Sequence, residues 1–312
     1  MRTGIVVDSS CDLPADFVRR HDIQVLPGSI RIGADVHTDA RDPQATLAFY
    51  QQSIGRRSVD AKSQSYPVAR IRNFFLDRLV SDFDHVICIP IWKARSSLHG
   101  NITSASLGIL SSYREYRADS GLRGAFSMRV VDSGTLFAGL GVQAAEGALM
   151  VSEGRSYLDI LARLGELSRH TVSCLVPDDV GYVRERARQR GENVGALFHM
   201  AGQALGLKPV VALHREKTRL VAGRRGQAAA VGHMLRRVAR VVREGGLMSR
   251  HVCVSYGGEL EAVPRMDGYD ELDSACREQG IPLLLSIMSV SAAVNVGAGA
   301  LSVAYAGAMA WD

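Results

Sequence analysis

The N-terminal stretch alternates short apolar runs with a polar turn and a short helical pattern. Residues 5–7 and 23–26 are apolar runs, and residues 15–21 between them have the pattern of a helix. A buried strand, a polar turn, a helix and a neighbouring strand form the beginning of an α/β sheet. The opening of the chain therefore predicts an α/β fold.

The polar turn after the first apolar run carries the first candidate ligand residues. Asp8, Ser9 and Ser10 follow that run directly, and open α/β sheets bind ligands at the carboxyl ends of their strands. Asp12 and Pro14 then mark the start of the helix, because proline suits the first helical position and aspartate can cap free amides. An ordinary turn built from Asp and Ser is the alternative. We expect Asp8 and Ser9 to line a cleft between two domains.

The same alternation continues along the chain, whose 312 residues suit two domains of about 150 residues each. The predicted strands of the first half are 5–7, 23–26, 85–91 and 129–131, and its helices are 15–21, 43–52, 68–80, 102–117 and 135–153. The predicted strands of the second half are 172–176, 209–213, 220–222, 251–256 and 283–288, and its helices are 180–189, 194–205, 227–244 and 268–279. We expect an α/β protein with an N-terminal domain, residues 1–167, whose largely parallel sheet is flanked by helices. A C-terminal α+β domain, residues 168–312, would have a mixed or antiparallel sheet and a hairpin near residue 215.

Composition excludes several classes of protein. Apolar residues make up 46% and charged residues 22% of the chain, so a sizeable core is available. Five scattered cysteines without a Cys-x-x-Cys pair are typical of a reduced, cytoplasmic protein that has no zinc site. No apolar signal segment is expected at the N-terminus, because Asp8 interrupts the first run. We expect no cofactor.

Two charge patterns need an interpretation. The excess of 37 basic over 32 acidic residues is carried mainly by arginines in helical patterns, which are typical of a solvated helix face. Low aromatic content, 6%, argues against a nucleic-acid partner. No charged residue lies between Glu278 and Asp312. Proline, serine and glycine dilute that stretch, so a buried strand and a glycine-rich closing element are favoured over a membrane span.

Short motifs of common enzymes are missing from the sequence. The chain contains no P-loop, no Gly-x-Ser-x-Gly and no His-Glu-x-x-His pattern. Gly139, Gly141 and Ala144 imitate a dinucleotide fingerprint, but they fall inside a predicted helix well beyond the preceding strand. We therefore do not expect a nucleotide site there.

Two further segments carry candidate ligand residues. Residues 53–66 have no periodicity and predict a loop, which would present Lys62, Ser63 and Gln64 to a ligand. The hydroxyls of residues 96–101 precede a predicted helix, where they either cap the helix or help its free amides to bind an anion. His99 lies in this turn and could titrate near neutral pH.

Several of these segments, in this order, resemble motifs of the DegV family. The resemblance rests on Asp8-Ser9-Ser10 with Asp12-Leu13-Pro14, Ala61-Lys62-Ser63-Gln64, Ser96-Ser97-Leu98-His99-Gly100, Val131-Asp132-Ser133, Leu207-Lys208-Pro209-Val210 and Asn295-x-Gly297-x-Gly299. It covers nearly the whole chain. DegV-like proteins bind a long-chain fatty acid in a tunnel between two α/β domains. In some bacteria they present its carboxyl group to a separate fatty acid kinase.

The resemblance implies a non-catalytic lipid-binding protein, which is not an enzyme. In the family, hydroxyls of the segments that match residues 62–64 and 96–100 hold the carboxylate, with a late histidine close by. Here Lys62, His99 and Asn295 replace a threonine, a serine and that histidine, and a kinase-docking Ser-Gly-Arg segment reads Gly191-Glu192-Asn193. The candidate ligand-binding residues are Asp8, Ser9, Lys62, Ser63, Gln64, Ser96, Ser97, His99, Gly100, Asn101, Asn295 and Gly297.

Three alternatives remain open at this point. Lys62 and His99 suit a more strongly anionic head group, such as a phosphorylated one, on the same scaffold. A hydrolytic enzyme would use Asp8, Ser97 and His99 as acid, nucleophile and base, although no spacing pattern supports that trio. The arginine-rich helices could contact nucleic acid, in which case binding would depend strongly on salt.

Overall fold

A parallel sheet forms the centre of the N-terminal half of the molecule. The computed structural model describes residues 2–51, 61–189 and 206–311. The sheet has the strand order β2-β1-β6-β7, with every neighbouring pair parallel. Its strands are β1 (Thr3–Asp8), β2 (Gln24–Leu26), β6 (His85–Ile89) and β7 (Ser127–Val130). The parallel arrangement predicted from the alternating pattern is confirmed.

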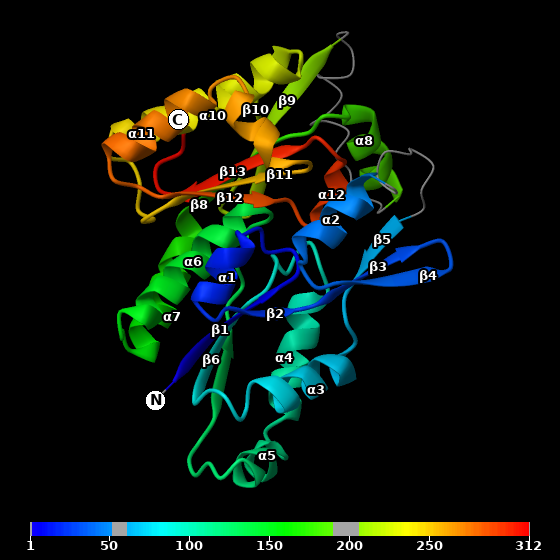
Figure 1. Cartoon of the computed structure of the whole chain (residues 1–312), viewed down its shortest axis with the longest axis vertical. Coiled ribbons are helices and arrows are strands. Elements are labelled where there is room, and N and C mark those ends of the chain that lie inside the picture. Colours follow the sequence, from blue (N-terminus) through cyan, green and yellow to red (C-terminus); the bar gives the residue numbers. More distant parts are fainter. Residues whose placement is uncertain (1, 52–60, 190–205, 312) are drawn as a thin grey trace.

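Helices surround this sheet (Figure 1). They are α1 (Ala15–Arg20), α3 (Val68–Arg78), α4 (Leu98–Gly108) and α5 (Tyr113–Asp119). The prediction of one helix over residues 102–117 is wrong, because α4 ends at Gly108 and α5 begins after Ser112. Glycine and serine are poor residues for a helix interior and favour the turn between them.

A small antiparallel sheet, which the sequence did not predict, extends from the N-terminal half. Its order is β4-β3-β5, with β3 (Gly28–Ile32), β4 (Asp35–Asp39) and β5 (Ala61–Gln64), and α2 (Pro43–Phe49) lies between β4 and β5 in the chain. The prediction that residues 61–64 belong to a loop is therefore wrong. Pairing with β3, which is distant in sequence, makes this segment a strand although it lacks periodicity.

The C-terminal half contains a mixed six-stranded sheet. Its order is β10-β9-β8-β13-β11-β12, and only β11 and β12 run parallel. The strands are β8 (Thr171–Val176), β9 (Leu207–His214), β10 (Lys217–Arg225), β11 (Val252–Tyr256), β12 (Leu283–Ile287) and β13 (Leu301–Ala306). The mixed sheet and the β9–β10 hairpin confirm the predicted α+β architecture.

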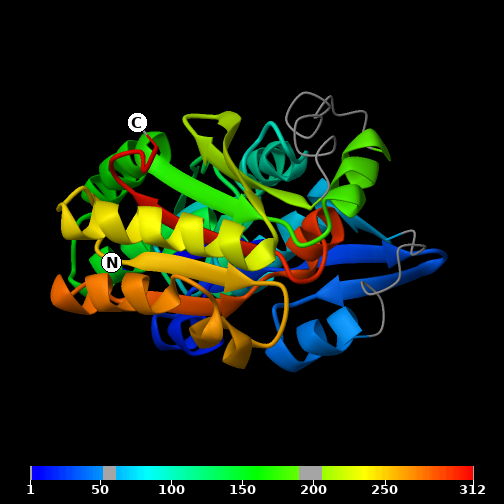
Figure 2. The same ribbon diagram turned by 90° about the horizontal axis from the view of Figure 1, so that it is seen from above.

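Helices of the C-terminal half lie mainly on one face of this sheet. Seen from above, α10 (Gln227–Arg243) and α11 (Tyr269–Glu278) lie side by side across it (Figure 2). The 3₁₀ helix η2 (Leu260–Arg265) precedes α11, while α8 (Val180–Gln189) and α12 (Val290–Val296) lie near the small sheet of the other half. The predicted helix 194–205 and the segment 191–193 fall outside the described residues.

Helix α6 (Ala138–Ser152) packs between the two large sheets. Its residues 138–148 are all buried, against β1 on one side and β11 and β13 on the other. A Cβ atom on Gly141 would lie 2.5 Å from the carbonyl oxygen of Asp12, and one on Gly147 would lie 3.2 Å from Ile5. Gly141, one of the glycines that imitate a dinucleotide fingerprint, therefore permits close packing, as does Gly147. Helix α7 (Tyr157–His170), which was not predicted, follows.

One apolar cluster continues through α6 from Ile5 and Val7 to Cys253 and Ala304. The strands of the parallel and small sheets precede residue 131 and those of the mixed sheet begin at residue 171. The domain division at residues 167 and 168 falls within the C-terminal end of α7 and stays a prediction.

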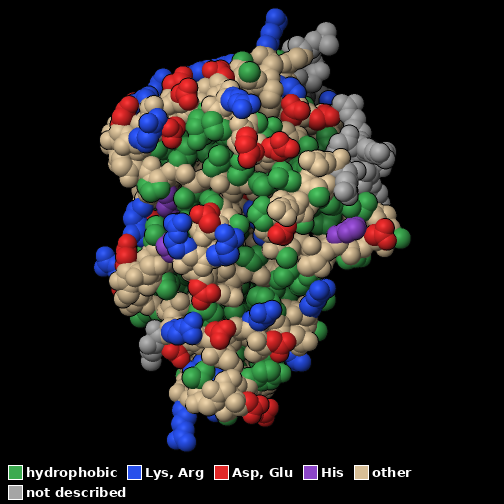
Figure 3. All heavy atoms as spheres, in the orientation of Figure 1, with side chains coloured by type: hydrophobic (Ala, Val, Ile, Leu, Met, Phe, Trp, Pro, Cys, Tyr) green, Lys and Arg blue, Asp and Glu red, His purple; other side chains and the backbone are tan. Residues whose placement is uncertain are grey.

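The charge patterns have structural explanations. Arg236 pairs with Asp267 and Glu271, and Arg243 pairs with Glu278. Arg186 does not belong to a solvated face, since it is buried and donates to the carbonyl oxygen of Ala61. Basic and acidic side chains are intermixed on the face in Figure 3.

The stretch after Glu278 forms β12, α12 and β13. In the parts of the chain that the structure describes, no helix combines the length and the apolar character that a membrane crossing needs.

The packing of α6 predicts opposite effects for two helical glycines. Gly141→Ala should lower the free energy of unfolding by about 1–3 kcal/mol, because its methyl group meets backbone that cannot move freely. Gly165→Ala in α7 should raise it by roughly 0.5–1 kcal/mol, because a Cβ there meets nothing within 4 Å. Urea denaturation of both variants checks this, and equal stability of Gly141→Ala and wild type would contradict the packing argument.

Burial of His251 against α6 predicts a dependence of stability on pH. Its Nε2 donates to the carbonyl oxygen of Val142 at 3.0 Å, and burial lowers its pKa from 6.5 to about 4. Because of this lowered pKa, His251 takes up a proton at a higher pH in the unfolded chain than in the folded protein. The wild-type protein should therefore lose up to about 1.4 kcal/mol per pH unit between 6.5 and 4 relative to His251→Gln. Unfolding curves across that range test it, and parallel profiles would refute it.

Candidate ligand-binding site

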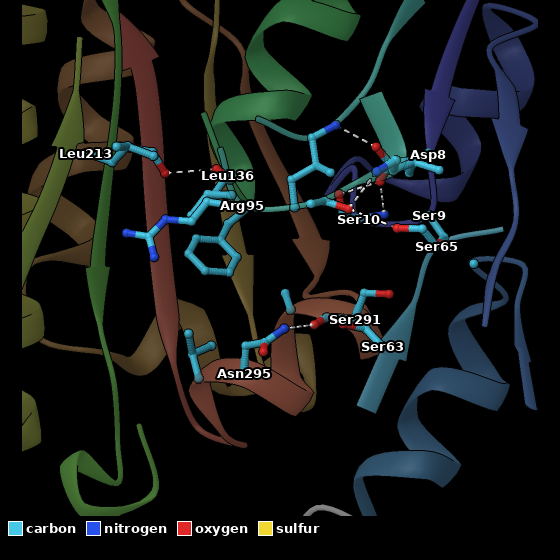
Figure 4. A pocket seen from close by; sticks show the side chains of 18 of the residues that line it. Asp8, Ser9, Ser10, Ser63, Ser65, Arg95, Leu136, Leu213, Ser291 and Asn295 are labelled. Atoms are coloured by element: carbon cyan, nitrogen blue, oxygen red, sulfur yellow. Dashed lines mark hydrogen bonds between the residues drawn. The ribbon is translucent and has the colours of Figure 1, made fainter. Parts of the chain in front are cut away.

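A cavity of about 440 Å³ lies where the two halves of the molecule meet. This volume falls within the roughly 300–1,000 Å³ that is usual for small-molecule sites. Its wall contains residues of both halves, from the ends of β1 and β5, the loop after β6, the start of α6, and β8, β9, β10, α8 and α12 (Figure 4).

The lining divides by chemistry. Most polar side chains come from the N-terminal half and from α12; these are Asp8, Ser9, Ser10, Ser63, Gln64, Ser65, Arg95, Ser96, Ser97, Ser291 and Asn295. Ser173 of β8 and Thr218 of β10 add two hydroxyl groups from the C-terminal half. Apolar side chains come mainly from the C-terminal half and the start of α6; among them are Leu136, Phe137, Leu175, Val183, Ala187, Val211, Leu213 and Val296. The cavity therefore suits a ligand with one polar part and one apolar part.

Asp8 organises the polar side at the end of β1. Its Oδ1 accepts hydrogen bonds from the backbone N–H and the hydroxyl of Ser10, and its Oδ2 accepts one from the N–H of Ile91 at 2.6 Å. Burial raises the pKa of Asp8, while the bonds from Ser10 and Ile91 act in the opposite direction. The carboxyl group thus ties the end of β1 to the loop after β6.

The turn before α4 contributes hydroxyl groups to the same side. The hydroxyls of Ser65 and Ser96 lie 3.1 Å apart and hydrogen-bond to each other, and Ser96 Oγ also accepts from the N–H of Leu98. Ser97 makes no capping hydrogen bond with its side chain. The capping role is therefore carried by Ser96, and the exposed Ser97 lines the cavity beside it.

Polar contacts from the N-terminal half hold α12 at the cavity. Asp12 accepts from the N–H of Ser289 at 2.8 Å, and Arg41 donates to the carbonyl oxygen of Ile287 at 2.9 Å. Tyr50 donates to the carbonyl oxygen of Met288. The prediction that Asp12 caps α1 is wrong, because no side chain caps that helix. Burial raises the pKa of Asp12, and the Arg41 guanidinium 3.6 Å away opposes the rise.

Phe137 has an unusual backbone at the apolar side. It precedes α6 with φ 55°, a region that residues other than glycine and asparagine seldom adopt. Such conformations persist where the surrounding structure enforces them, often at binding sites. Here the turn directs the chain from the cavity into the buried helix α6.

Seven of the predicted site residues lie in the cavity wall. These are Asp8, Ser9, Ser63, Gln64, Ser96, Ser97 and Asn295. Asn295 donates from Nδ2 to the carbonyl oxygen of Ser291 at 2.7 Å, which fixes its side chain on α12. Their roles toward a ligand stay predictions.

The other five predicted residues lie outside the wall. Lys62 is exposed, and since strand side chains alternate it faces away from Ser63. Asn101 donates to the carbonyl oxygen of Tyr66, and the carbonyl oxygen of His99 accepts from Thr103. Gly297 ends α12 with φ 87°, and Gly100 is exposed. Lys62 and His99 are therefore not brought together as cations around a head group.

Sequence reasoning did not include several polar residues of the wall, which are Ser10, Ser65, Tyr66, Arg95, Ser173, Thr218 and Ser291. Arg95 directly precedes Ser96 and Ser97, so its neighbours in sequence were a usable signal. Thr218 follows the β9–β10 hairpin turn and has no comparable signal.

Among the described residues, no group of three or more metal-ligating side chains is placed to hold an ion.

Comparisons with known proteins agree with this architecture. The family model described as "Uncharacterised protein, DegV family" matches residues 2–308. A DegV domain-containing protein of Xanthomonas campestris pv. campestris is 43% identical over 307 residues, which cover 98% of each chain.

Solved structures of similar fold include two proteins described by the lipid they bind. A stearic acid-binding protein from Eubacterium ventriosum has a TM-score of 0.78 and 18% identity, and the match covers 98% of each chain. A Thermotoga maritima protein described as revealing fatty acid binding function has a TM-score of 0.76 and 17% identity, with 99% and 100% of the chains covered.

The contacts of Asp8 predict that replacing it will cost stability. Asp8→Asn directs an amide group at either Ile91 or Ser10, both of which need an acceptor, so the free energy of unfolding should fall by about 2–3 kcal/mol. Asp16→Asn is the control, since Asp16 forms an exposed pair with Arg20 and should change it by less than about 0.5 kcal/mol. Chemical denaturation of both variants measures the difference, and equal effects would exclude a special role for Asp8.

Proposed function

Because the chain belongs to the DegV family, we propose that it binds a long-chain fatty acid in the cavity between its halves. The observation that supports this most is the division of the cavity wall into a hydroxyl-rich side and an apolar side. Relatives of the same fold are described as stearic acid-binding and fatty acid-binding proteins. Binding is proposed to leave the fatty acid chemically unchanged.

The apolar side would supply most of the affinity. Val211 and Leu213 of β9, with Val183 and Ala187 of α8, present aliphatic surface to the cavity. Each methylene that leaves water contributes about 0.8 kcal/mol, so about ten buried methylenes supply the roughly 8 kcal/mol of micromolar binding. The remaining methylenes of a long-chain tail offset part of the ordering costs. The tail would therefore determine affinity and chain-length preference.

The polar side would receive the carboxyl group. Ser63, Ser96 and Ser97 offer hydroxyl donors, and Asn295 lies on the α12 side of the same space. Neutral donors of this kind orient an anionic head group without fixing its identity. We also propose that the protein presents this carboxyl group to a partner kinase, because the resemblance to the family implies it.

A carrier role is also consistent with how the candidate catalytic trio is arranged. Asp8 and Ser97 line the cavity, but His99 does not, and the Asp8 carboxylate is already engaged by Ser10 and Ile91. A base that reaches the nucleophile is the usual requirement of hydrolysis. The geometry thus favours binding over turnover.

The proposal predicts which ligand copurifies with the protein and how the affinity depends on the length of the ligand's tail. Native mass spectrometry of purified protein should find about one long-chain fatty acid per chain. Val183→Trp should shorten the usable cavity and weaken binding of palmitate by tenfold or more relative to a shorter acid, since two excluded methylenes amount to about 1.6 kcal/mol.

Leu158→Trp is the matched control, because Leu158 is an exposed residue of α7 outside the cavity wall. It should leave both affinities unchanged. Absence of any bound or exchangeable fatty acid would refute the proposed function.

A further inference from the structure

A glycine leaves a small niche in the polar wall where the two halves meet. Gly28, at the start of β3, lines the cavity together with Ser9 of the turn after β1 and Ser291 of α12. A Cβ atom on Gly28 would collide with Ser9 Oγ and lie 3.6 Å from Ser291 Oγ. The two hydroxyl oxygens are therefore no more than about 6 Å apart, a span that one oxygen atom can bridge with two hydrogen bonds. This space is the Gly28 niche.

The Ser9 hydroxyl is buried but unpaired. Ser9 is 3% exposed, and its hydroxyl has no hydrogen-bond partner among the described residues, although its N–H donates to the carbonyl oxygen of Leu26. The neighbouring Ser10 hydroxyl, in contrast, donates to Asp8. Burying a hydroxyl without a partner costs free energy. An unpaired hydroxyl in the wall of a cavity therefore indicates a ligand atom or a water molecule that bonds to it.

Ser291 supplies the complementary group. Burial raises the pKa of Asp39, and Arg41, followed by the N–H and the hydroxyl of Ser291, opposes the rise. A hydroxyl whose proton faces Asp39 keeps its lone pairs for the cavity. The niche thus offers an acceptor at Ser291 and, at Ser9, a group that can donate or accept. A ligand hydroxyl fits both because it donates and accepts, whereas an ionised carboxylate oxygen only accepts.

The niche lies near the hydroxyls that are proposed to receive the carboxyl group. Gly28 and Ser63 belong to the adjacent strands β3 and β5, in which Ser63 pairs with Ile30. Adjacent strands lie about 4.8 Å apart, so a few carbon–carbon bonds separate the niche from Ser63. Figure 4 shows Ser9 and Ser291 on the same side of the cavity as Ser63. A ligand whose carboxyl group meets Ser63 would place its first few carbons at the niche.

We propose that the protein binds a fatty acid with a hydroxyl group near its carboxyl end, as in a 2- or 3-hydroxy acid, and that this hydroxyl occupies the Gly28 niche between Ser9 and Ser291. This deepens the proposed function and rests on it, because it names the class of fatty acid. An unsubstituted fatty acid leaves the niche to a water molecule. A hydroxy acid releases that water and makes the same hydrogen bonds with its own oxygen.

The test compares acids of constant chain length. Binding of palmitic, 2-hydroxypalmitic, 3-hydroxypalmitic and 16-hydroxypalmitic acid to delipidated full-length protein is measured by titration calorimetry, with enantiomers tested separately. The 2- or the 3-hydroxy acid should bind about tenfold more tightly than palmitic acid, because it gains hydrogen bonds in a buried site. The 16-hydroxy acid should bind more weakly than palmitic acid, because its hydroxyl meets the apolar wall.

Two substitutions probe the niche itself. Ser9→Ala removes its donor, and Gly28→Ala fills it with a methyl group. Each should reduce the ratio of the affinities for the hydroxy acid and palmitic acid from about ten toward one. Ser97→Ala is the matched control in the wall, since it should weaken all the acids alike and keep the ratio. Ser104→Ala, at an exposed position of α4 outside the wall, should change no affinity.

Two failures are distinguishable. If wild-type protein binds none of the acids, the proposed function is wrong. If it binds palmitic acid but prefers neither the 2- nor the 3-hydroxy acid, or if the preference survives in Ser9→Ala, the niche holds only water and this inference alone is wrong. An equal gain for the 16-hydroxy acid would also overturn it. Unfolding curves show which variants are folded, and Ser9→Ala decides the question if Gly28→Ala does not fold.

Discussion

The arrangement of the whole molecule depends on α6, a helix that is buried between two sheets. Residues 138–148 of α6 are all buried, and glycine and alanine at seven of these eleven positions allow the close approach of the neighbouring elements. Gly141 faces the backbone at Asp12, and Gly147 faces Ile5 of β1. On the opposite side the helix packs on β11 and β13. Close packing of one helix thereby fixes how far apart the sheets lie, and hence the width of the space between their edges.

A second connection between the halves is polar. Asp12, Arg41 and Tyr50 contact three consecutive residues, 287–289, before α12. Buried hydrogen bonds of this kind specify one arrangement, because breaking any of them leaves a polar group unpaired away from water. The apolar contact through α6 thus fixes the distance between the halves, and the polar contacts place α12. The cavity is the space that these two connections leave open.

The sequence predicted those helices and strands whose burial is visible in one continuous run of residues. The apolar runs of β1 and β6 and the long helix α6 could be read directly, because burial on both faces leaves a continuous apolar segment. The sheet β4-β3-β5 could not, since residues 35–39 and 61–64 are largely polar and become strands only through distant pairing. That error also misplaced Lys62. In a strand the side chains of Lys62 and Ser63 point to opposite faces, whereas in a loop both could face a ligand.

The motifs that resemble the family mix residues of two kinds, and the structure separates them. Asp12, Asn101 and Gly297 hold turns and helices in place, so their presence reports on the fold. Ser63, Ser97 and Asn295 line the cavity, so their chemistry bears on the proposed ligand. Arg95 shows why sequence alone could not rank these positions: an arginine in a polar loop usually extends into water. Only the approach of β10, more than a hundred residues later in the chain, places its guanidinium at the wall of the cavity. The chemistry of the cavity wall is therefore set by residues that come together only where the two halves meet.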